Sequence, residues 1–590
     1  MPKRQPVAPL LLLAVFLASS CGHDDGGDAK TEPVPQKVPP GCGTFDPSRP
    51  KPAPQSITVV HLDPALAPAK QLAVAACAGL HNRKAGGSVF LDADPHDLGW
   101  LSELGLSAGR TVDADQFLTS CVAAFPSCVR YDYAKQKALL PNVLTAAAAL
   151  GAVPLDDSLK LPCDSPVFDA VAELADKTTP ALATKYVFAK FGAQTTGLAM
   201  LNPGYDQGSS NPRSPALINE MKPALVDFVF SEKLFVVFLV NGCTKDHEER
   251  AVLSSIVNAG KWPTPVAVYG YNNSWNVLGG YLYEAQTNCL DSHNMGAVAS
   301  EAGNLSFFAT RAPAITEAGA VVQNPPEVVT YDPQKTYVAF VVGDGDNIQY
   351  MLTTRRDWFQ QRVAGCEANP NACAPLSWSI SPHLTRLAPD VLGWYYAKSH
   401  QTKRDYFVLP PSGHLYAYPS SMADESQNHF VEATDRDACV LGLTGVVHWD
   451  EVGTWHEAED HFLPKYLKNG AIRGVFPVNV PFAFPIFTWW PDEQFFEVLK
   501  DTEGARLALF RPREWRGIDS DSDAFRLKPE RMAAEIAAYP KGTVTWVYMT
   551  SDGGLTLENS FLALGKLLPP HVQLVSTDTA ANLAIASQPR

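Results

Sequence analysis

Two aspartates and an asparagine follow a strongly apolar segment in the sequence VAFVVGDGDNIQYM (residues 338–351). Five residues with strand character lead into a turn that carries Asp344, Asp346 and Asn347. Two carboxyl groups this close in sequence can act as an acid and a base, or bind a hard cation. Gly, Asp and Asn are also ordinary residues of turns and helix caps. The stretch therefore predicts a catalytic or cation-binding turn at the carboxyl end of a strand, with a structural turn as the alternative.

A second acidic pair, Asp450 and Glu451, directly follows the apolar segment GVVHW. Adjacent side chains diverge, so we expect one of the two to point toward the other polar groups and not both. The alternative is an acidic pair that caps a helix. Glu514 and Asp552 also follow apolar segments, but they are weaker candidates because a local arginine or a helix cap would account for them.

Three histidines, His383, His414 and His448, lie at the ends of apolar segments as well. Together with an aspartate pair they could form the site of a metal-dependent, deacetylase-like hydrolase, although a single histidine is more often a hydrogen-bonded structural residue. No CxxC or Cys/His cluster has the spacing of a zinc site. We therefore predict no metal or other cofactor, with a divalent cation at Asp344 and Asp346 as the alternative.

The elements that position these residues repeat along the C-terminal part of the chain. Strand-like segments recur roughly every 30 to 40 residues, each ending in a polar or aromatic cluster, and helical patterns lie between them. This spacing predicts a full or incomplete (β/α) TIM-like barrel over residues 330–590, with the clusters lining one edge. The seven segments are VAFVV, LSWSI, YFVLP, GVVHW, GVFPVNV, LALF and TVTWVYM.

The preceding part of the chain alternates between strand and helix patterns, which is typical of small α/β domains. We expect three of them, over residues 56–118, 119–240 and 241–325. The fold class predicted for the whole chain is therefore α/β.

The first twenty residues have the pattern of a signal peptide. Lys3 and Arg4 precede the apolar run LLLLAVFL, which is too short to span a bilayer, and small residues lead into Cys21. This resembles a bacterial lipoprotein signal, in which the cysteine is lipidated; a secretory signal cleaved nearby is the alternative. Residues 21–55 are acidic and then proline-rich, so we expect an extended tether. The expected location is the bacterial cell envelope, lipid-anchored at the outer membrane or periplasmic face, or the exterior after secretion.

Cysteine content and charge limit the compartment and the partners. Of 11 cysteines, ten remain when Cys21 is set aside, which fits disulfides formed in an oxidising compartment. Cys121 with Cys128 and Cys366 with Cys373 are the expected local pairs. The formal net charge of −15 argues against a nucleic-acid partner, because phosphate binding requires clustered Lys and Arg.

The segment PSGHLYAYP (residues 411–419) resembles the motif that names the GxGYxYP family of putative glycoside hydrolases. Gly413 matches the first glycine, Leu415 replaces the second, and Tyr416, Tyr418 and Pro419 are intact. Other segments are similar to parts of the same family, so the resemblance covers nearly the whole chain after residue 55. They are CAGLHNRK, PNVLTAAAALGAVP, ASEAGNLSFF and VAFVVGDGDNIQYM, while VAVYGYNNSW departs from the more tryptophan-rich version expected there.

The resemblance implies a barrel-like C-terminal domain behind smaller α/β domains, and hydrolysis of a poly- or oligosaccharide. Glycosidic hydrolysis needs two carboxyl groups, one to protonate the leaving oxygen and one to act on the anomeric carbon or on water. A metal-dependent hydrolase and a non-catalytic carbohydrate-binding surface lipoprotein are the alternatives. The predicted catalytic residues are Asp344, Asp346, Asp450 and Glu451, and the predicted substrate-binding residues are Asn347, His383, His414, Tyr416, Tyr418 and Trp449.

Overall fold

The computed structural model of the protein describes residues 56–204, 224–272, 282–478, 487–550 and 554–588. The predicted signal peptide, the tether and the lipidation site at Cys21 lie outside these residues, as does Asp552. Within the described ranges, no helix is both long enough and apolar enough to cross a membrane.

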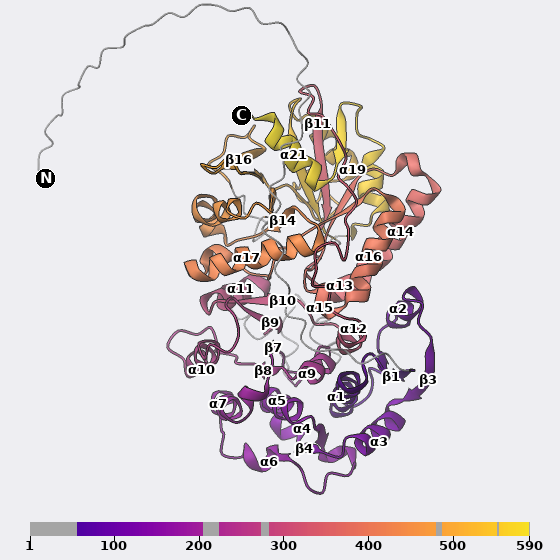
Figure 1. Cartoon of the computed structure of the whole chain (residues 1–590), viewed down its shortest axis with the longest axis vertical. Coiled ribbons are helices and arrows are strands. Elements are labelled where there is room, and N and C mark those ends of the chain that lie inside the picture. The colour runs from indigo at the N-terminus through magenta and orange to yellow at the C-terminus, as the bar shows by residue number, and fades with distance from the viewer. Residues whose placement is uncertain (1–55, 205–223, 273–281, 479–486, 551–553, 589–590) are drawn as a thin grey trace, which may run out of the picture. The chain divides into compact units, whose positions relative to one another are not determined.

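Three parallel sheets form the N-terminal part of the chain (Figure 1). The third sheet contains strands from before and after residue 240, where the sequence analysis placed a domain boundary. The domain limits themselves stay a prediction. In order across each sheet, the strands are β2 (Val89–Asp92), β1 (Ile57–His61) and β3 (Ala108–Asp113); β5 (Val153–Asp156), β4 (Cys128–Tyr131) and β6 (Phe168–Asp169); and β10 (Met295–Val298), β9 (Val266–Gly270), β7 (Leu198–Met200) and β8 (Phe235–Val237).

Helix α1 (Pro68–Ala85) lies at the centre of this part because its sequence is rich in small residues. Its middle, AVAACAGL, is buried, and helices α3 (Ala114–Ala124), α9 (Val226–Glu232) and α12 (Leu305–Arg311) pack against it. Small side chains let neighbouring backbones approach closely and fill the space between them.

Disulfides connect elements within these layers, and one predicted pair is wrong. Cys121 bonds to Cys77, which joins α3 to α1, whereas Cys128 begins β4 of the next sheet and bonds to Cys163. Cys121 and Cys128 are near in sequence but belong to different layers, so each finds its partner there. Two further disulfides join Cys243 to Cys289 and Cys366 to Cys373, and the latter was predicted. Cys439 is also disulfide-bonded.

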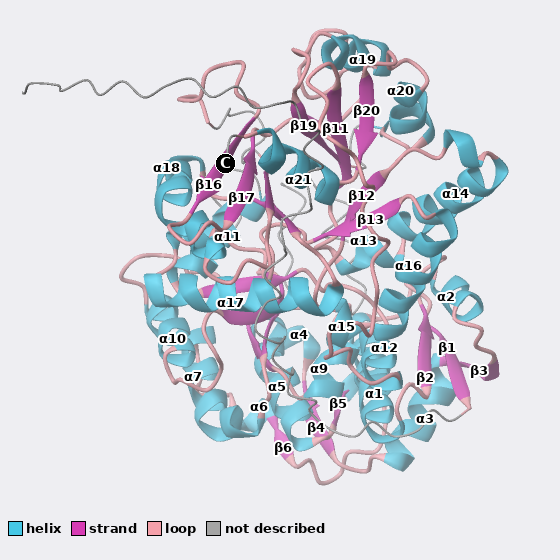
Figure 2. Cartoon of the chain, turned by 45° about the horizontal axis from the view of Figure 1, so that its top comes forward, coloured by secondary structure: helices cyan, strands magenta, loops and turns pink. Residues whose placement is uncertain are grey.

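All seven strands predicted in the C-terminal part form, and they divide between two sheets (Figure 2). The α/β class is therefore confirmed. The first sheet has the order β13 (Asp405–Val408), β12 (Leu376–Ser379), β11 (Thr336–Val342), β19 (Val544–Met549) and β18 (Glu514–Trp515), with β20 (Val572–Val575) also paired to β11; the second has the order β14 (Gly445–His448), β15 (Gly474–Pro477), β17 (Arg506–Phe510) and β16 (Phe496–Lys500).

The described strands do not close a barrel, so the TIM-like barrel is not confirmed. The two sheets meet through a single parallel bridge between Leu409 and Val446, and β16 runs antiparallel at the edge of the second sheet. Side chains of both sheets and of helix α21 (Thr577–Ser587) nevertheless pack in one core. The sequence pattern predicted the individual strands because each depends on local periodicity, whereas closure depends on pairing between distant strands.

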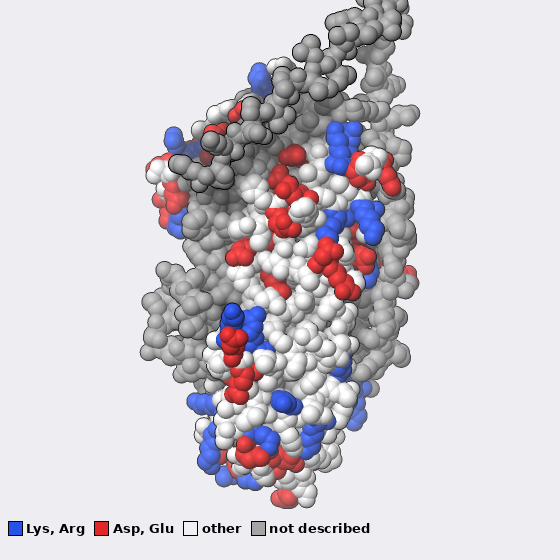
Figure 3. Space-filling model, turned by 90° about the vertical axis from the view of Figure 1, so that its left-hand side faces the viewer, with Lys and Arg blue, Asp and Glu red and all other residues white. Residues whose placement is uncertain are grey.

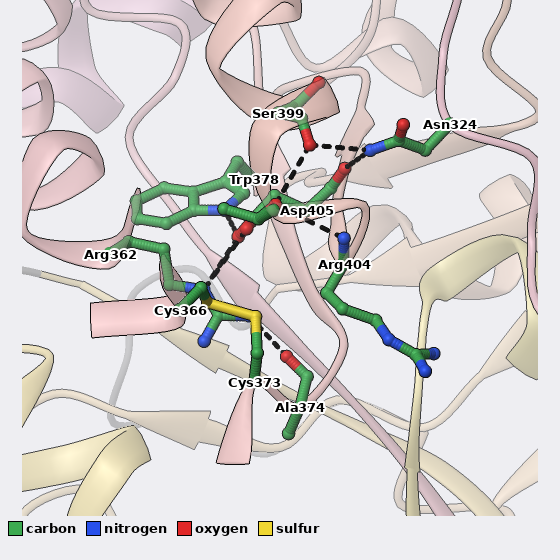
Figure 4. The surroundings of a disulfide bond; sticks show 10 residues. Asn324, Arg362, Cys366, Cys373, Ala374, Trp378, Ser399, Arg404 and Asp405 are labelled. Atoms are coloured by element: carbon green, nitrogen blue, oxygen red, sulfur yellow. Dashed lines mark hydrogen bonds and ion pairs between the residues drawn. A yellow bond between two sulfur atoms is a disulfide. The ribbon is translucent and has the colours of Figure 1, made fainter. Parts of the chain in front are cut away.

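Helices α14 (Thr354–Ala368) and α16 (Pro389–Thr402) lie side by side next to the first sheet (Figure 1). Figure 4 shows how α14 is attached to that sheet. Arg362 of α14 forms a fully buried ion pair with Asp405 of β13 at 3.0 Å, and the indole of Trp378 donates to the same carboxylate at 2.8 Å. The Cys366–Cys373 disulfide closes the chain between the end of α14 and β12.

Candidate active site

Four polar segments follow neighbouring parallel strands of the C-terminal part. Because the carboxyl ends of parallel strands meet at one edge, we expect these segments to lie together. We call them the rim: residues 343–347 after β11, 381–383 after β12, 411–419 after β13 and 449–451 after β14.

The end of β10, from the N-terminal part, connects two segments of the rim. Ala297 exchanges backbone hydrogen bonds of 3.0 and 2.9 Å with Tyr416, and two residues later the carbonyl of Ala299 accepts from the N–H of Ile348 at 2.9 Å. Both contacts lie on one extended segment, where two residues span roughly 7 Å. The turn at 343–347 and the motif at 411–419 are therefore neighbours at the same edge.

The turn at 343–347 is tightly constrained. A side chain at Gly345 would meet the carbonyl oxygen of Ser379 at 1.9 Å, so only glycine fits there. Asp344 lies in the left-handed region with φ 59°, which aspartate tolerates better than most residues. Asn347 caps helix α13 (Ile348–Leu352), since its side chain accepts a hydrogen bond from the N–H of Tyr350 at 3.0 Å. The Asn347 side chain therefore has the helix-capping role that the sequence analysis gave as the alternative to a catalytic or cation-binding turn.

The two aspartates of the turn interact electrostatically with each other and with β18 and β19. Burial and then the charge of Asp344 raise the pKa of Asp346 to about 7. The backbone N–H of Asp344 donates to the Tyr548 hydroxyl at 3.0 Å, and burial and the two aspartates raise the pKa of Tyr548 well above its usual value. Arg516 lies 5.8 Å from the centre of the Tyr548 ring and forms an ion pair with the buried Glu514. Burial opposes the charge on Arg516, but Glu514, Tyr548 and Asp344 together raise its pKa.

The side chains of the second predicted acidic pair diverge, one into the core and one toward solvent. Asp450 is fully buried and accepts hydrogen bonds from Ser420 Oγ at 2.5 Å, His448 Nε2 at 3.2 Å and Thr454 Oγ1 at 3.2 Å. Glu451 is exposed. Asp450 therefore has the surroundings of a structural residue, since its carboxylate accepts hydrogen bonds from neighbouring side chains. Glu451 is the member of the pair that solvent reaches.

A third carboxyl group, which the sequence analysis missed, lies next to Asp450. Asp291 of α11 (Leu282–Ser292) is 2% exposed, and its Oδ2 accepts the backbone N–H of Tyr418 at 3.0 Å. Its Oδ1 has no hydrogen-bond partner among the residues that the structure describes. Burial and the charges of Asp450 and Glu451 raise the pKa of Asp291 well above its usual value, which favours its uncharged form. No local sequence signal marks Asp291, since it lies near the end of an ordinary helical pattern.

The predicted histidines form a pair and a separate residue. His383 Nε2 lies 2.6 Å from the carbonyl oxygen of His414, and their ring centres are 5.2 Å apart. His448 is fully buried against Phe462 and interacts with Asp450 instead. Among the residues with described positions, no group of three or more His, Cys, Asp or Glu side chains is arranged to hold a metal ion.

The predicted aromatic residues lie in one cluster. The rings of Tyr416 and Tyr418 are 4.1 and 5.3 Å from Trp449, and Tyr271 is 6.3 Å from Tyr416. Tyr418 and Trp449 are 1% and 4% exposed, so they belong to the core, while Tyr416 is half-buried. Tyr416 is therefore the predicted aromatic residue placed to contact a ligand.

Glu301 is a second missed acidic residue, three positions after the end of β10. It is half-buried, and burial raises its pKa to about 8. The search for acidic residues just after apolar strand-like segments, which identified Asp344, would have found Glu301 too. A pocket of about 800 Å³, including its open mouth, is lined in part by Ala302, the residue that directly follows Glu301 in sequence. It is lined mainly by apolar groups and by Asp94, Asp97, Asn304 and Gln349, and contains no predicted site residue.

Comparison with known proteins identifies the C-terminal part. Residues 334–483 match the family model described as GxGYxYP putative glycoside hydrolase C-terminal domain. This segment is similar to the GxGYxYP family. The GxGYxYP domain contains all ten predicted catalytic and substrate-binding residues, from Asp344 to Glu451.

One solved structure shows a similar fold over a longer range. A crystal structure of a putative hydrolase from Bacteroides thetaiotaomicron is 18% identical, with a TM-score of 0.64, and covers 93% of this chain and 100% of its own. A putative polysaccharide deacetylase from Mycobacterium smegmatis is 13% identical, with a TM-score of 0.30, over 46% of this chain and 97% of its own, which is too distant to support an argument. No curated protein matches the chain.

The charged surface near the GxGYxYP domain is mixed. On the face drawn in Figure 3, the Lys and Arg side chains lie in small separate groups, mostly beside Asp or Glu. This face has no continuous basic stripe of the kind that contacts a phosphate backbone.

Proposed function

We propose that this protein is a glycoside hydrolase that acts on a poly- or oligosaccharide outside the cytoplasm, with Asp346 as the proton donor and Asp344 as its ionised neighbour. The observation that carries the proposal is the coupling of the two carboxyl groups on the turn after β11, which raises the pKa of Asp346 to about 7. The family match supports the reaction class.

The chemistry requires an acid that holds its proton near neutral pH. The glycosidic oxygen must be protonated as it leaves, and a carboxyl group with a pKa near 7 is both protonated and acidic enough to do this. A buried strand and the capped helix α13 hold the turn from both sides, so Asp346 is positioned by rigid elements.

The rest of the rim supplies candidate contacts to the sugar. Tyr416 offers a half-buried aromatic face, and Glu451 is an exposed carboxylate of the same rim. Asn347, His383 and His414 complete the proposed binding residues, while Tyr418, Trp449 and Asp450 support them from the core. The shared core of the two C-terminal sheets supports an incomplete barrel as the scaffold.

The four described disulfides support export to an oxidising compartment. We further propose that Cys21 carries a lipid that anchors the protein to the cell envelope. In cell fractionation, the wild-type protein should sediment with membranes and Cys21→Ser should not. Equal sedimentation of both would contradict the anchor.

The catalytic proposal is tested with purified protein and a panel of polysaccharides and oligosaccharides. We expect the wild type to release new reducing ends from at least one of them, and Asp346→Asn and Asp344→Asn each to lower turnover by about a hundredfold or more, the usual scale for acid–base groups. Asp115→Asn, an exposed aspartate of α3, is the matched control and should leave turnover unchanged.

Two other results would replace the proposal. Glycan binding that survives both substitutions, without cleavage by the wild type, would indicate a binding protein. Cleavage that a chelator abolishes and a divalent cation restores would indicate a metal-dependent hydrolase.

A further inference from the structure

His414 of the rim is paired with a buried carboxylate from a different element. Its Nδ1 lies 2.7 Å from Oδ2 of Asp437, on helix α17 (Asp424–Leu441). The Asp437 side chain is 5% exposed, and the His414 side chain is 15% exposed. A carboxylate only accepts hydrogen bonds, so the hydrogen of this pair lies on Nδ1. Nε2 is therefore the basic nitrogen of neutral His414.

Helix α17 holds the backbone of His414 as well as its side chain. The N–H of His414 donates to Thr434 Oγ1 at 3.1 Å, and Thr434 is three residues before Asp437, so both lie on the same face of α17. Gly413 has φ 108°, and a side chain there would meet the Thr434 methyl at 2.6 Å. The glycine of the family motif thus lets the loop lie directly on α17, which brings His414 to Asp437.

His383 provides a second imidazole with a defined hydrogen position. Its Nε2 faces the His414 carbonyl oxygen at 2.6 Å, so the hydrogen lies on Nε2. Burial, followed by the charges of His414 and Arg386, lowers the pKa of His383 to about 4, although Asp437 opposes this. His383 is therefore neutral at neutral pH and does not compete with His414 for a proton. The charged groups that face this pair are Asp437 and Arg386.

We infer that His414 is an acid–base residue of the rim, held in place by Asp437, and that its Nε2 takes the proton of the attacking water. This rests on the proposed function for its substrate class. The water O–H bond breaks as its hydrogen moves to Nε2, and the water oxygen bonds to the anomeric carbon. The bond from that carbon to the leaving oxygen breaks, and the leaving oxygen receives the Asp346 proton. The Asp437 carboxylate stabilises the imidazolium that forms.

The order of the strands fits this division of roles. Strand β12 lies between β11, which precedes Asp346, and β13, which precedes His414. Two strand spacings amount to roughly 10 Å, close to the separation of about 6.5 to 9.5 Å between the acid and the base of an inverting glycosidase. The inference therefore predicts inversion at the anomeric carbon.

The first test needs no substrate. Diethyl pyrocarbonate reacts with an accessible imidazole nitrogen that carries a lone pair, and mass spectrometry locates the modified residue. In the folded wild type we expect modification of His414 at pH 7 to 8 and slower modification in Asp437→Asn. The exposed His61, which also faces a carboxylate, serves as the reactive reference, and the buried His448 as the unreactive one. An unreactive His414 beside a reactive His61 would overturn the inference.

The second test uses a glycan cleaved by the wild type. His414→Gln should lower kcat by about a hundredfold, and Asp437→Asn should lower kcat with little change in KM and shift the acidic limb of the pH profile. Asp435→Asn is the matched control, because Asp435 lies on the same helix but bonds to Asn469. Added imidazole should partly restore turnover by His414→Ala.

The outcomes separate this inference from the proposed function. Retention at the anomeric carbon, or an unchanged pH profile in Asp437→Asn, would reject the role of His414 while leaving Asp346 as the proton donor. Wild-type protein that cleaves no glycan would contradict the proposed function, and the modification experiment would still decide whether Nε2 is free and basic.

Discussion

At the scale of single residues, carboxyl groups with raised pKa values occur in and beside the rim. Asp346, Glu301 and Asp291 all have raised pKa values, and burial is the largest cause in each case. Soluble proteins seldom bury carboxyl groups without a compensating partner. Their gathering at one edge of the sheets is the pattern expected of a functional site.

The raised pKa of Asp346 predicts a pH-dependent stability. In the unfolded chain Asp346 has its ordinary pKa of 3.8, and in the folded protein its pKa is about 7. At a pH between these two values the folded state therefore binds more protons than the unfolded state. Stability therefore falls as pH rises through this window. Asp346→Asn removes this titration, so its free energy of unfolding should equal that of the wild type near pH 4 and exceed it above pH 7. Urea titrations at several pH values measure the difference, and a constant difference would contradict the prediction.

The buried aspartates 291 and 450 should respond differently to the same substitution. Burial raises the pKa of Asp291 well above its usual value, which favours the uncharged carboxyl group, and Asn is uncharged and keeps the oxygen that accepts from Tyr418. Asp450 accepts from several donors, and Asn would direct an NH₂ group at some of them. We expect Asp450→Asn to lower the free energy of unfolding at pH 7 by about 1 to 3 kcal/mol, and Asp291→Asn to lower it by less. The reverse order in chemical denaturation would refute this assignment.

At the scale of elements, contacts between segments far apart in the chain hold the rim. The end of β10 hydrogen-bonds to both the turn after β11 and the motif after β13, and α17 positions His414. Helix α14 is fixed to the sheet beneath by the Arg362–Asp405 pair and the Cys366–Cys373 disulfide (Figure 4).

Removing one member of the buried ion pair should be costly. Arg362→Ala leaves Asp405 charged and buried, and the loss of one partner from such a pair typically costs about 3 to 5 kcal/mol. Arg526→Ala is the control, because Arg526 and Asp519 form an exposed pair that solvent screens, and no measurable change is expected. Equal thermal stability of the two variants would show that the buried pair does not stabilise α14.

At the scale of the whole molecule, three disulfides close long loops within the N-terminal part. Cys77–Cys121, Cys128–Cys163 and Cys243–Cys289 have sequence separations of 44, 35 and 46 residues. Cross-links over loops of this size restrict the unfolded chain and contribute about 3 to 4 kcal/mol each in the chain-entropy account.

Reduction should therefore lower the melting temperature strongly. Peptide mapping without reductant should recover these three pairs and Cys366–Cys373. Cys366→Ser/Cys373→Ser, which opens a loop of only 7 residues, should lower the melting temperature less than Cys77→Ser/Cys121→Ser. A mapped Cys121–Cys128 peptide would contradict the structure.

The sequence by itself determined the features that depend on local pattern. Apolar segments with polar ends predicted all seven strands of the C-terminal part, and the turn at Asp344–Asn347 was found because its residues are contiguous. The motif at 411–419 identified the family for the same reason. The cysteines 366 and 373 were paired correctly because they are near in sequence and belong to the same layer.

Only the tertiary structure decided which distant groups meet. Asp291 and Asp437 lie in ordinary helix patterns, and their importance comes from packing against the rim. The partner of Cys121 and the division of the strands between two sheets were decided in the same way. A local pattern specifies which face of an element is buried, whereas the partner of that face is selected by long-range packing, which no short stretch of sequence contains.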